Sequence, residues 1–153
     1  MLNMKKMLLA VACMALPLCA SAQEAKSDSV FHTYIYNDEY KVYMELNLYG
    51  NDVDVPGQDV FGKVPGYFGA VRDSRKWLIT DAKLSGADKA DLDIVNDYGS
   101  EDLTATLTYD KSTGKYVLRQ TGGSRLKIVV NRKWVKIPTE LELVPHERVL
   151  STW

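Results

Sequence analysis

The sequence predicts an all-β protein: an antiparallel meander of about eight to nine strands that forms a closed or partly open barrel or, alternatively, a β-sandwich. Three observations favour this class. Apolar and polar residues alternate along several short segments, as they do on half-buried strands. Turn residues recur mostly about ten to fourteen residues apart, too close for parallel crossovers. After residue 23, no segment keeps apolar residues at helical spacing for three turns. A barrel is favoured because closure removes exposed strand edges.

The strands follow from period-two patterns, which are clearest in Tyr40–Tyr49 and Leu103–Tyr109. In the first segment Met44 and Leu46 share one face with other apolar residues, and Glu45 lies on the opposite face. In the second segment, three Thr alternate with apolar residues, and Thr suits both strands and solvent. Weaker alternation predicts seven further strands, at 31–36, 67–71, 77–84, 92–95, 116–120, 126–130 and 140–144.

The breaks between these segments contain Gly, Asn and Asp, which tolerate the positive φ angles of tight hairpins. The irregular stretch Asn51–Gly66 contains two Val-Pro-Gly sequences, and Pro followed by Gly predicts a type II turn. We expect this stretch to fold over one end of the barrel. Short helices are expected at Ala87–Asp91 and Pro145–Trp153.

Residues 1–22 predict a cleaved signal peptide, followed by one β-barrel domain at 23–153. Two Lys precede an apolar run at Met7–Leu18, and the small residues Ala20-Ser21-Ala22 follow it. The run is shorter than the roughly 20 residues of a membrane-spanning helix, so no transmembrane segment is expected in the mature chain. These features predict export to the periplasm or the extracellular space.

The cysteines bear on lipid anchoring and on disulfides. Cys19 could be a lipoprotein attachment site, but bulky Leu18 precedes it where that processing takes a small residue, so a lipid anchor is not expected. Both Cys13 and Cys19 lie in the predicted signal peptide. The mature chain therefore has no disulfide and no thiolate metal site.

Charge and histidine content narrow the function classes. A net charge of −1 gives no basic surface for nucleic acid. His32 and His146 lie near opposite chain ends and outside any zinc-binding spacing, so neither a metal nor a cofactor is expected. Acids two residues apart would share one face of a strand, as a hydrolase with paired carboxylates requires. Such pairs occur at Asp52/Asp54, Asp91/Asp93 and Glu140/Glu142.

Aromatic residues give the best indication of a binding site. Nine Tyr and three Trp combine flat apolar faces with polar edges. Trp77 follows Arg75-Lys76 and Trp134 follows Arg132-Lys133, so in both places two bases lead from a turn into a strand that opens with an indole. We expect both indoles at the barrel rim. The predicted ligand-binding residues are Tyr67, Trp77 and Trp134, with Asn51–Gly66 as a lid.

Three functions remain open at this point. The first is a non-enzymatic, secreted or periplasmic protein that binds a small amphipathic ligand or a carbohydrate. The second is a protein-interaction module, such as a secreted inhibitor or an envelope assembly factor, and the third is a carboxylate-dependent hydrolase. A hollow barrel would favour the first. An interior filled by Met44, Leu46, Leu107 and Ile128 would favour the second.

Five segments of the sequence carry a resemblance to known proteins: SAQ at 21–23, VYMELNLYG at 42–50, GYFGAVRD at 66–73, WLITDAKLSG at 77–86 and LELV at 141–144. They resemble a group of small secreted lipocalin-like or meander β-barrel proteins, of uncharacterised function, from anaerobic Gram-negative gut bacteria. The resemblance spans nearly the whole mature chain and implies a meander barrel. It brings no catalytic residues with it.

Overall fold

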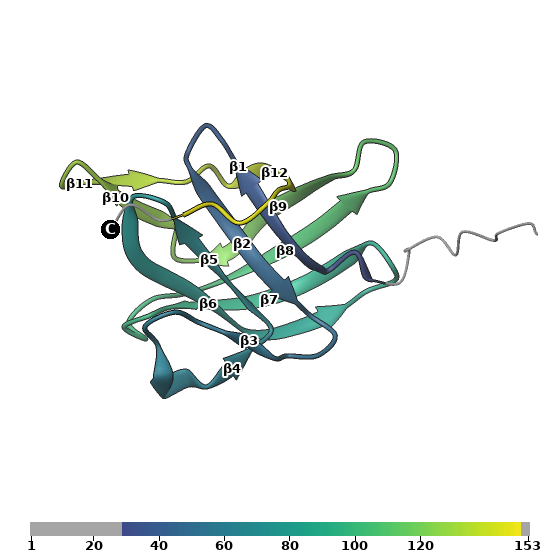
Figure 1. Ribbon diagram of the computed structural model, residues 1–153, viewed down its shortest axis with the longest axis horizontal. Coiled ribbons are helices and arrows are strands. Elements are labelled where there is room, and N and C mark those ends of the chain that lie inside the picture. Colours follow the sequence, from purple (N-terminus) through teal and green to yellow (C-terminus); the bar gives the residue numbers. More distant parts are fainter. Residues whose placement is uncertain (1–28, 151–153) are drawn as a thin grey trace, which may run out of the picture.

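The computed structural model describes residues 29–150 and shows an antiparallel sheet that curves around one core (Figure 1). The apolar residues that alternate along its strands face that core. Eight strands form a closed barrel in the order β1-β12-β9-β8-β7-β6-β5-β2. This meander confirms the predicted all-β barrel in place of the sandwich. The barrel strands are β1 (His32–Asn37), β2 (Val42–Asn47), β5 (Gly66–Ala70), β6 (Asp73–Leu84), β7 (Lys89–Asn96), β8 (Asp102–Asp110), β9 (Lys115–Gly123) and β12 (Glu140–Pro145).

The predicted signal peptide at 1–22, the expected mature start at Gln23 and the absence of lipid at Cys19 concern positions outside the described residues. Within 29–150, no helix is both long and apolar enough to cross a membrane.

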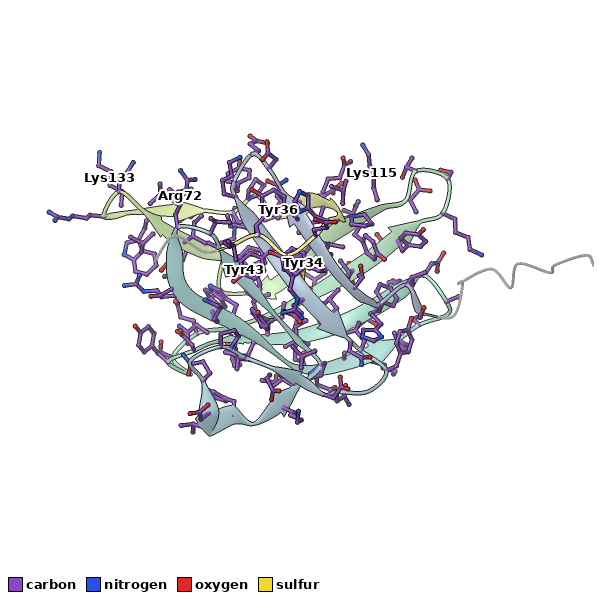
Figure 2. All side chains as sticks on the ribbon, in the orientation of Figure 1. Tyr34, Tyr36, Tyr43, Arg72, Lys115 and Lys133 are labelled. Carbon is purple, nitrogen blue, oxygen red and sulfur yellow. The ribbon has the colours of Figure 1, made fainter. Side chains whose placement is uncertain are left out.

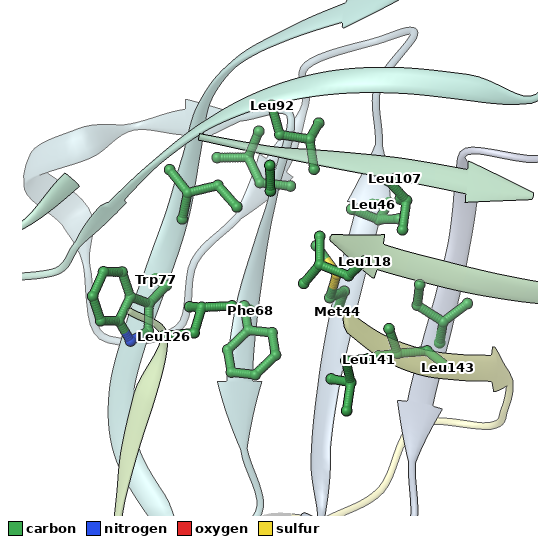
Figure 3. Packing of buried hydrophobic residues seen from close by; sticks show 14 of the residues in the cluster. Met44, Leu46, Phe68, Trp77, Leu92, Leu107, Leu118, Leu126, Leu141 and Leu143 are labelled. Atoms are coloured by element: carbon green, nitrogen blue, oxygen red, sulfur yellow. The ribbon is translucent and has the colours of Figure 1, made fainter. Parts of the chain in front are cut away.

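The barrel interior is filled by side chains. Met44, Leu46, Leu107 and Ile128 are all buried in one continuous cluster with the inward-facing residues of every barrel strand. Figure 3 shows Met44, Leu46 and Leu107 among the packed side chains of this cluster. Phe68, with no exposed surface, lies in the same cluster. An eight-stranded barrel is just wide enough for its side chains to fill it, and these do so.

Two small hairpins stand outside the barrel sheet. The first consists of β3 (Val53–Asp54) and β4 (Lys63–Val64), with a 3₁₀ turn at Asp59–Phe61 between them. The second consists of β10 (Lys127–Val130) and β11 (Lys133–Lys136), which project from the barrel in Figure 1. The alternation predicts β10 within 126–130 but no strand for β3 or β4, and β11 is expected only as the strand that opens with Trp134.

The stretch Asn51–Gly66 covers the outer wall of the barrel, so the expectation of a loop over its end is wrong. Val53, Val55 and Val64 pack against the outward-facing side chains of β2 and β5. Gly57 has the positive φ of a type II turn, 76°, but Gly66 already belongs to β5. A Cβ on Gly66 would lie 2.4 Å from the carbonyl oxygen of Glu45, so close strand pairing requires glycine there.

The two expected helices are absent from the described chain. Ala87–Asp91 leads into β7, where Ala90 and Leu92 face the core and the residues between them face solvent. Pro145 ends β12, and 146–150 follow without regular structure. Both segments are too short to form a helix without packing support, and the sheet offers pairing instead.

A second hydrophobic cluster lies on the outer wall, where β1, β2, β5 and β6 meet the β3–β4 hairpin. We call its four tyrosines, Tyr34, Tyr36, Tyr43 and Tyr67, the outer tyrosine cluster. Val149 of the C-terminal segment packs against it. Strand β2 is therefore buried on both faces although it belongs to a barrel wall.

Candidate functional site

The β10–β11 hairpin packs one of its faces against the barrel core. Asn131 and Arg132 connect the strands with φ angles of 52° and 64°, the geometry of a two-residue type I′ turn. Paired residues of a hairpin share a face. Ile128 and its partner Val135 face the barrel core, which places Val129 and its partner Trp134 on the opposite face.

Polar contacts fix this hairpin to the barrel wall. The indole Nε1 of Trp77 donates to the carbonyl oxygen of Lys127 at 3.3 Å. The main-chain N–H of Val129 donates to Oδ2 of buried Asp73 at 2.7 Å. Lys127 also forms an ion pair with Glu101, with Nζ 2.8 Å from Oε1. The outward face of the hairpin is therefore held in a defined position relative to β6 and the β7–β8 turn.

A pocket of about 340 Å³ lies between the hairpin, β6 and the β7–β8 turn. Trp77 and Trp134 both line it, together with Tyr98 and three cationic residues, Arg75, Lys76 and Lys127. Cζ of Arg75 and Nζ of Lys127 lie 5.2 and 5.1 Å from the centroid of the Trp134 ring. At this distance each cation is attracted to the negative face of the indole.

Two aromatic side chains at this pocket face solvent. Trp134 is 58% exposed and Tyr98 is 73% exposed. We call the set Arg75, Tyr98, Lys127 and Trp134 the hairpin patch. The guanidinium of Arg75 pairs with Oδ1 of Asp73 at 3.0 Å, and this contact raises the pKa of Arg75. Lys127 pairs with Glu101, so each cation of the patch is held by an acid beside the patch.

The structure brings two of the three predicted ligand-binding residues together. Trp134 is exposed on the β10–β11 hairpin, but Trp77 is only 4% exposed, so the expectation of a rim position for Trp77 is wrong. Trp77 packs in the barrel core because it alternates inward with Ile79 on β6. Tyr67 does not join them, because it points outward from β5 into the outer tyrosine cluster.

The surroundings of Tyr67 are those of a packed residue. Its hydroxyl donates to Oε2 of Glu45 at 3.1 Å, and the other carboxylate oxygen of Glu45 pairs with Arg148. Tyr34 and Tyr43 stack beside it with ring centroids 5.2 Å apart, and Figure 2 shows these two rings together over β1 and β2. Burial raises the pKa of all three tyrosines, that of Tyr34 to about 12.

Most acids of the predicted carboxylate pairs have partners of their own. Asp54 pairs with Lys63 at 3.2 Å, and Asp52 accepts a hydrogen bond from the Asn47 amide at 2.8 Å. Glu140 and Glu142 pair with Arg119 and Lys115 at 2.9 and 2.8 Å. Asp91 and Asp93 lie on the exposed face of β7. This arrangement supports a solvated outer face and gives no support to paired acid–base chemistry.

The described part of the chain contains no group of three or more His, Cys, Asp or Glu side chains placed to hold a metal ion. His146 instead tilts against the ring of Tyr36, with centroids 4.8 Å apart. His32 lines a polar groove of about 510 Å³ beside Glu45, Asp52 and Asp54.

Sequence reasoning missed Tyr98 and Lys127 as members of the site, and it placed Arg75 beside Trp77, not beside Trp134. A signal for Tyr98 was present, because an aromatic residue in the turn sequence Asp97-Tyr98-Gly99 has no strand face on which to pack. The two cations could not be assigned before the hairpin's position was known. Their contact with Trp134 depends on the folding of β10–β11 against β6.

Comparison with known proteins identified no relative. No protein-family model, curated protein sequence or solved structure matches the chain.

Proposed function

We propose that this protein is an exported, non-enzymatic protein-interaction module that recognises its partner through the hairpin patch. One observation carries the proposal: two exposed aromatic rings, Trp134 on the β10–β11 hairpin and Tyr98 in the β7–β8 turn, line the same pocket on a barrel whose interior is filled. Trp, Tyr and Arg are the residue types that dominate binding energy at protein interfaces.

The filled interior favours this function over ligand storage inside the barrel. The small-ligand hypothesis needs a cavity, and Met44, Leu46, Leu107 and Ile128 occupy the space where it would lie. An interaction module needs no cavity. It needs rigid aromatic anchors with polar groups around them, and Trp134 with Arg75, Lys127 and Glu101 meets that description.

Site-directed photo-crosslinking tests the proposal. A benzophenone amino acid replaces Tyr98, and the same group replaces exposed Ser112 at the β8–β9 turn as the matched control. We expect a discrete protein adduct in extracts of the cells that make the protein, formed from position 98 and lost on Trp134→Ala. Equal adducts from both positions, or none from position 98, would contradict the proposal.

A small amphipathic ligand or carbohydrate in the pocket of about 340 Å³ is the second candidate, because Trp77 and Trp134 both line that pocket. Its volume lies at the lower end of the range for ligand pockets, about 300–1,000 Å³. Fluorescence titration with bile acids, fatty acids and oligosaccharides tests this candidate. A saturable change that Trp134→Phe abolishes would favour it, and no response from any of these ligands would exclude them.

A further inference from the structure

The two edges of the β10–β11 hairpin differ in their hydrogen bonding. Ile137 N–H donates to the Leu126 carbonyl at 2.8 Å, and hydrogen-bonded pairs then alternate along an antiparallel hairpin. The main-chain groups of Lys127 and Val129 therefore point away from β11. There, the Trp77 indole donates to the carbonyl of Lys127, and Asp73 accepts from the N–H of Val129. The β10 edge is thus capped by the barrel wall.

The β11 edge has no such cap. By the same alternation, the main-chain N–H and carbonyl groups of Trp134 and Lys136 point away from β10. Within the part of the chain that the structure describes, no strand pairs with this side of β11, and the hairpin is a two-stranded sheet. A row of main-chain donors and acceptors at an open edge is a template for an added strand.

The charge around this edge is of one sign. The segment 125–136 contains five bases and no acid. Lys127 is paired with Glu101, but Arg132, Lys133 and Lys136 are exposed and form no ion pair with described residues. Figure 2 shows Lys133 at the projecting end of the hairpin. The free edge is therefore cationic although the whole chain has a net charge of −1.

We propose that the free edge of β11 takes up an extended acidic segment of a partner protein as an added β-strand, with one of its side chains resting on Trp134. This inference rests on the proposed interaction function and names the kind of partner. Main-chain hydrogen bonds to Trp134 and Lys136 supply affinity, and the lysines select acidic side chains.

The same charges argue against a second copy of this chain as the occupant. Pairing of two β11 edges would bring Lys133 and Lys136 of one copy beside the same bases of the other, and like charges on paired strands are destabilising. Lysines at an open edge prevent such self-pairing. An acidic strand meets no such barrier, and it would lie next to the exposed indole of Trp134.

Nuclear magnetic resonance titration with synthetic peptides tests the inference on the intact chain. The probe is an eight-residue peptide of alternating glutamate and threonine, with a lysine–threonine peptide as the control. We expect the amide resonances of Trp134 and Lys136 to shift saturably with the acidic peptide only. No shift at millimolar acidic peptide, or equal shifts with both peptides, would overturn the proposal.

A variant pair separates main-chain pairing from simple charge attraction. Lys136→Pro removes the outward N–H, and edge strands tolerate proline, whereas Lys136→Ala removes the same charge and keeps the N–H. We expect the acidic peptide to bind Lys136→Pro about tenfold more weakly than Lys136→Ala, as the loss of one main-chain hydrogen bond predicts. Equal affinities in two folded variants would overturn strand addition.

Methylation of the peptide nitrogens tests the same point without changing the protein. An added strand directs the N–H groups of every second residue toward β11. We therefore compare a peptide methylated on its glutamate nitrogens with one methylated on its threonine nitrogens. We expect one of these two peptides to bind about tenfold more weakly than the other, because only one of them loses the N–H groups that face β11. Equal affinities would identify a general polyanion surface and overturn the proposal. The Tyr98 crosslink would then still report on the interaction function independently.

Discussion

The carboxylate of Asp73 accepts a hydrogen bond from the main-chain N–H of Val129 at 2.7 Å, which joins the start of β6 to the β10–β11 hairpin. The other oxygen of this carboxylate accepts from the main-chain and side-chain nitrogens of Arg75 at 3.2 and 3.0 Å. One buried acid therefore holds both the hairpin and a cation of the hairpin patch. The position of Trp134 depends on it.

Replacing Asp73 with Ala should lower the free energy of unfolding by roughly 1.5–3 kcal/mol, because hydrogen bonds to a buried charged group are lost. Ser74→Ala, one residue away and exposed, should change it by less than about 0.5 kcal/mol. Urea denaturation measures both. Equal small effects would show that the hairpin is held by Trp77 and by core packing alone.

Much of the barrel could be predicted from the sequence because each strand buries one face. In β8 the alternation of Leu103, Ala105 and Leu107 with three Thr is unbroken, and the structure buries the three apolar residues. The β11 strand was harder to predict, because Trp134 and Val135 are adjacent apolar residues on opposite faces. The turn before it uses Asn-Arg, without the Gly that commonly marks such hairpins.

The candidate site was only half predictable. Two bases precede both Trp77 and Trp134, so the two tryptophans look equivalent in the sequence. Their burial differs because only Trp77 lies on a barrel strand with its side chain facing the core. Tyr67 was expected to share their pocket. The sequence does not show that Tyr67 points outward from β5. The β3–β4 hairpin covers the outer face of that strand, so the residues on it are apolar like those of the core. Covered outer walls break the rule that one strand face is polar.

Truncation of Leu46 should strongly lower the free energy of unfolding. This residue lies in the barrel core with 1% of its surface exposed, so Leu46→Ala opens a cavity and should cost roughly 2–5 kcal/mol. The change in denaturation midpoint at constant slope gives the value. A loss below about 1 kcal/mol would mean that the interior collapses around the missing methyl groups and is less rigidly packed than its burial indicates.

Glu45, the next residue, illustrates the effect of the covered wall. The alternation alone predicts a solvated side chain whose removal costs under about 0.5 kcal/mol. In the structure its side chain is 15% exposed, and its carboxylate accepts a hydrogen bond from Tyr67. Glu45→Ala should therefore cost about 1–3 kcal/mol, because the hydroxyl of buried Tyr67 loses its acceptor. The double variant Glu45→Ala/Tyr67→Phe should recover part of this loss, and strict additivity would contradict the coupling.

Alkaline pH should unfold the protein through its tyrosines. Burial raises the pKa of Tyr34 and Tyr116 to about 12, whereas a tyrosine in an unfolded chain ionises near pH 10. The folded state thus favours the neutral form, and the resulting stability is present below about pH 10 and lost as pH rises toward about 12. Burial lowers the pKa of Lys76, so the folded state favours the neutral amine. This group therefore makes the protein more stable as pH rises, and its contribution stops changing above about pH 10.5, where lysine in the unfolded chain has also lost its proton.

Denaturation curves recorded across this alkaline range, with tyrosinate absorbance followed in parallel, check the prediction. Tyr34→Phe should make the loss of stability with pH shallower. Stability that stays constant to about pH 12 would show that these hydroxyls ionise as freely in the folded protein as in the unfolded chain.

Substitution of the two tryptophans at the candidate site should have different effects: loss of Trp77 should reduce stability, and loss of Trp134 should reduce partner binding. Trp77 fills core space and anchors Lys127, so Trp77→Ala should cost about 3–5 kcal/mol. Trp134 is mostly exposed, and Trp134→Ala should cost no more than about 1 kcal/mol from its cation contacts. Thermal denaturation gives both values, and crosslinking from position 98 gives partner binding. We expect Trp134→Ala to keep the fold and lose the adduct. If Trp134→Ala binds normally while folded, the exposed indole is not the anchor and the hairpin patch is not the interface.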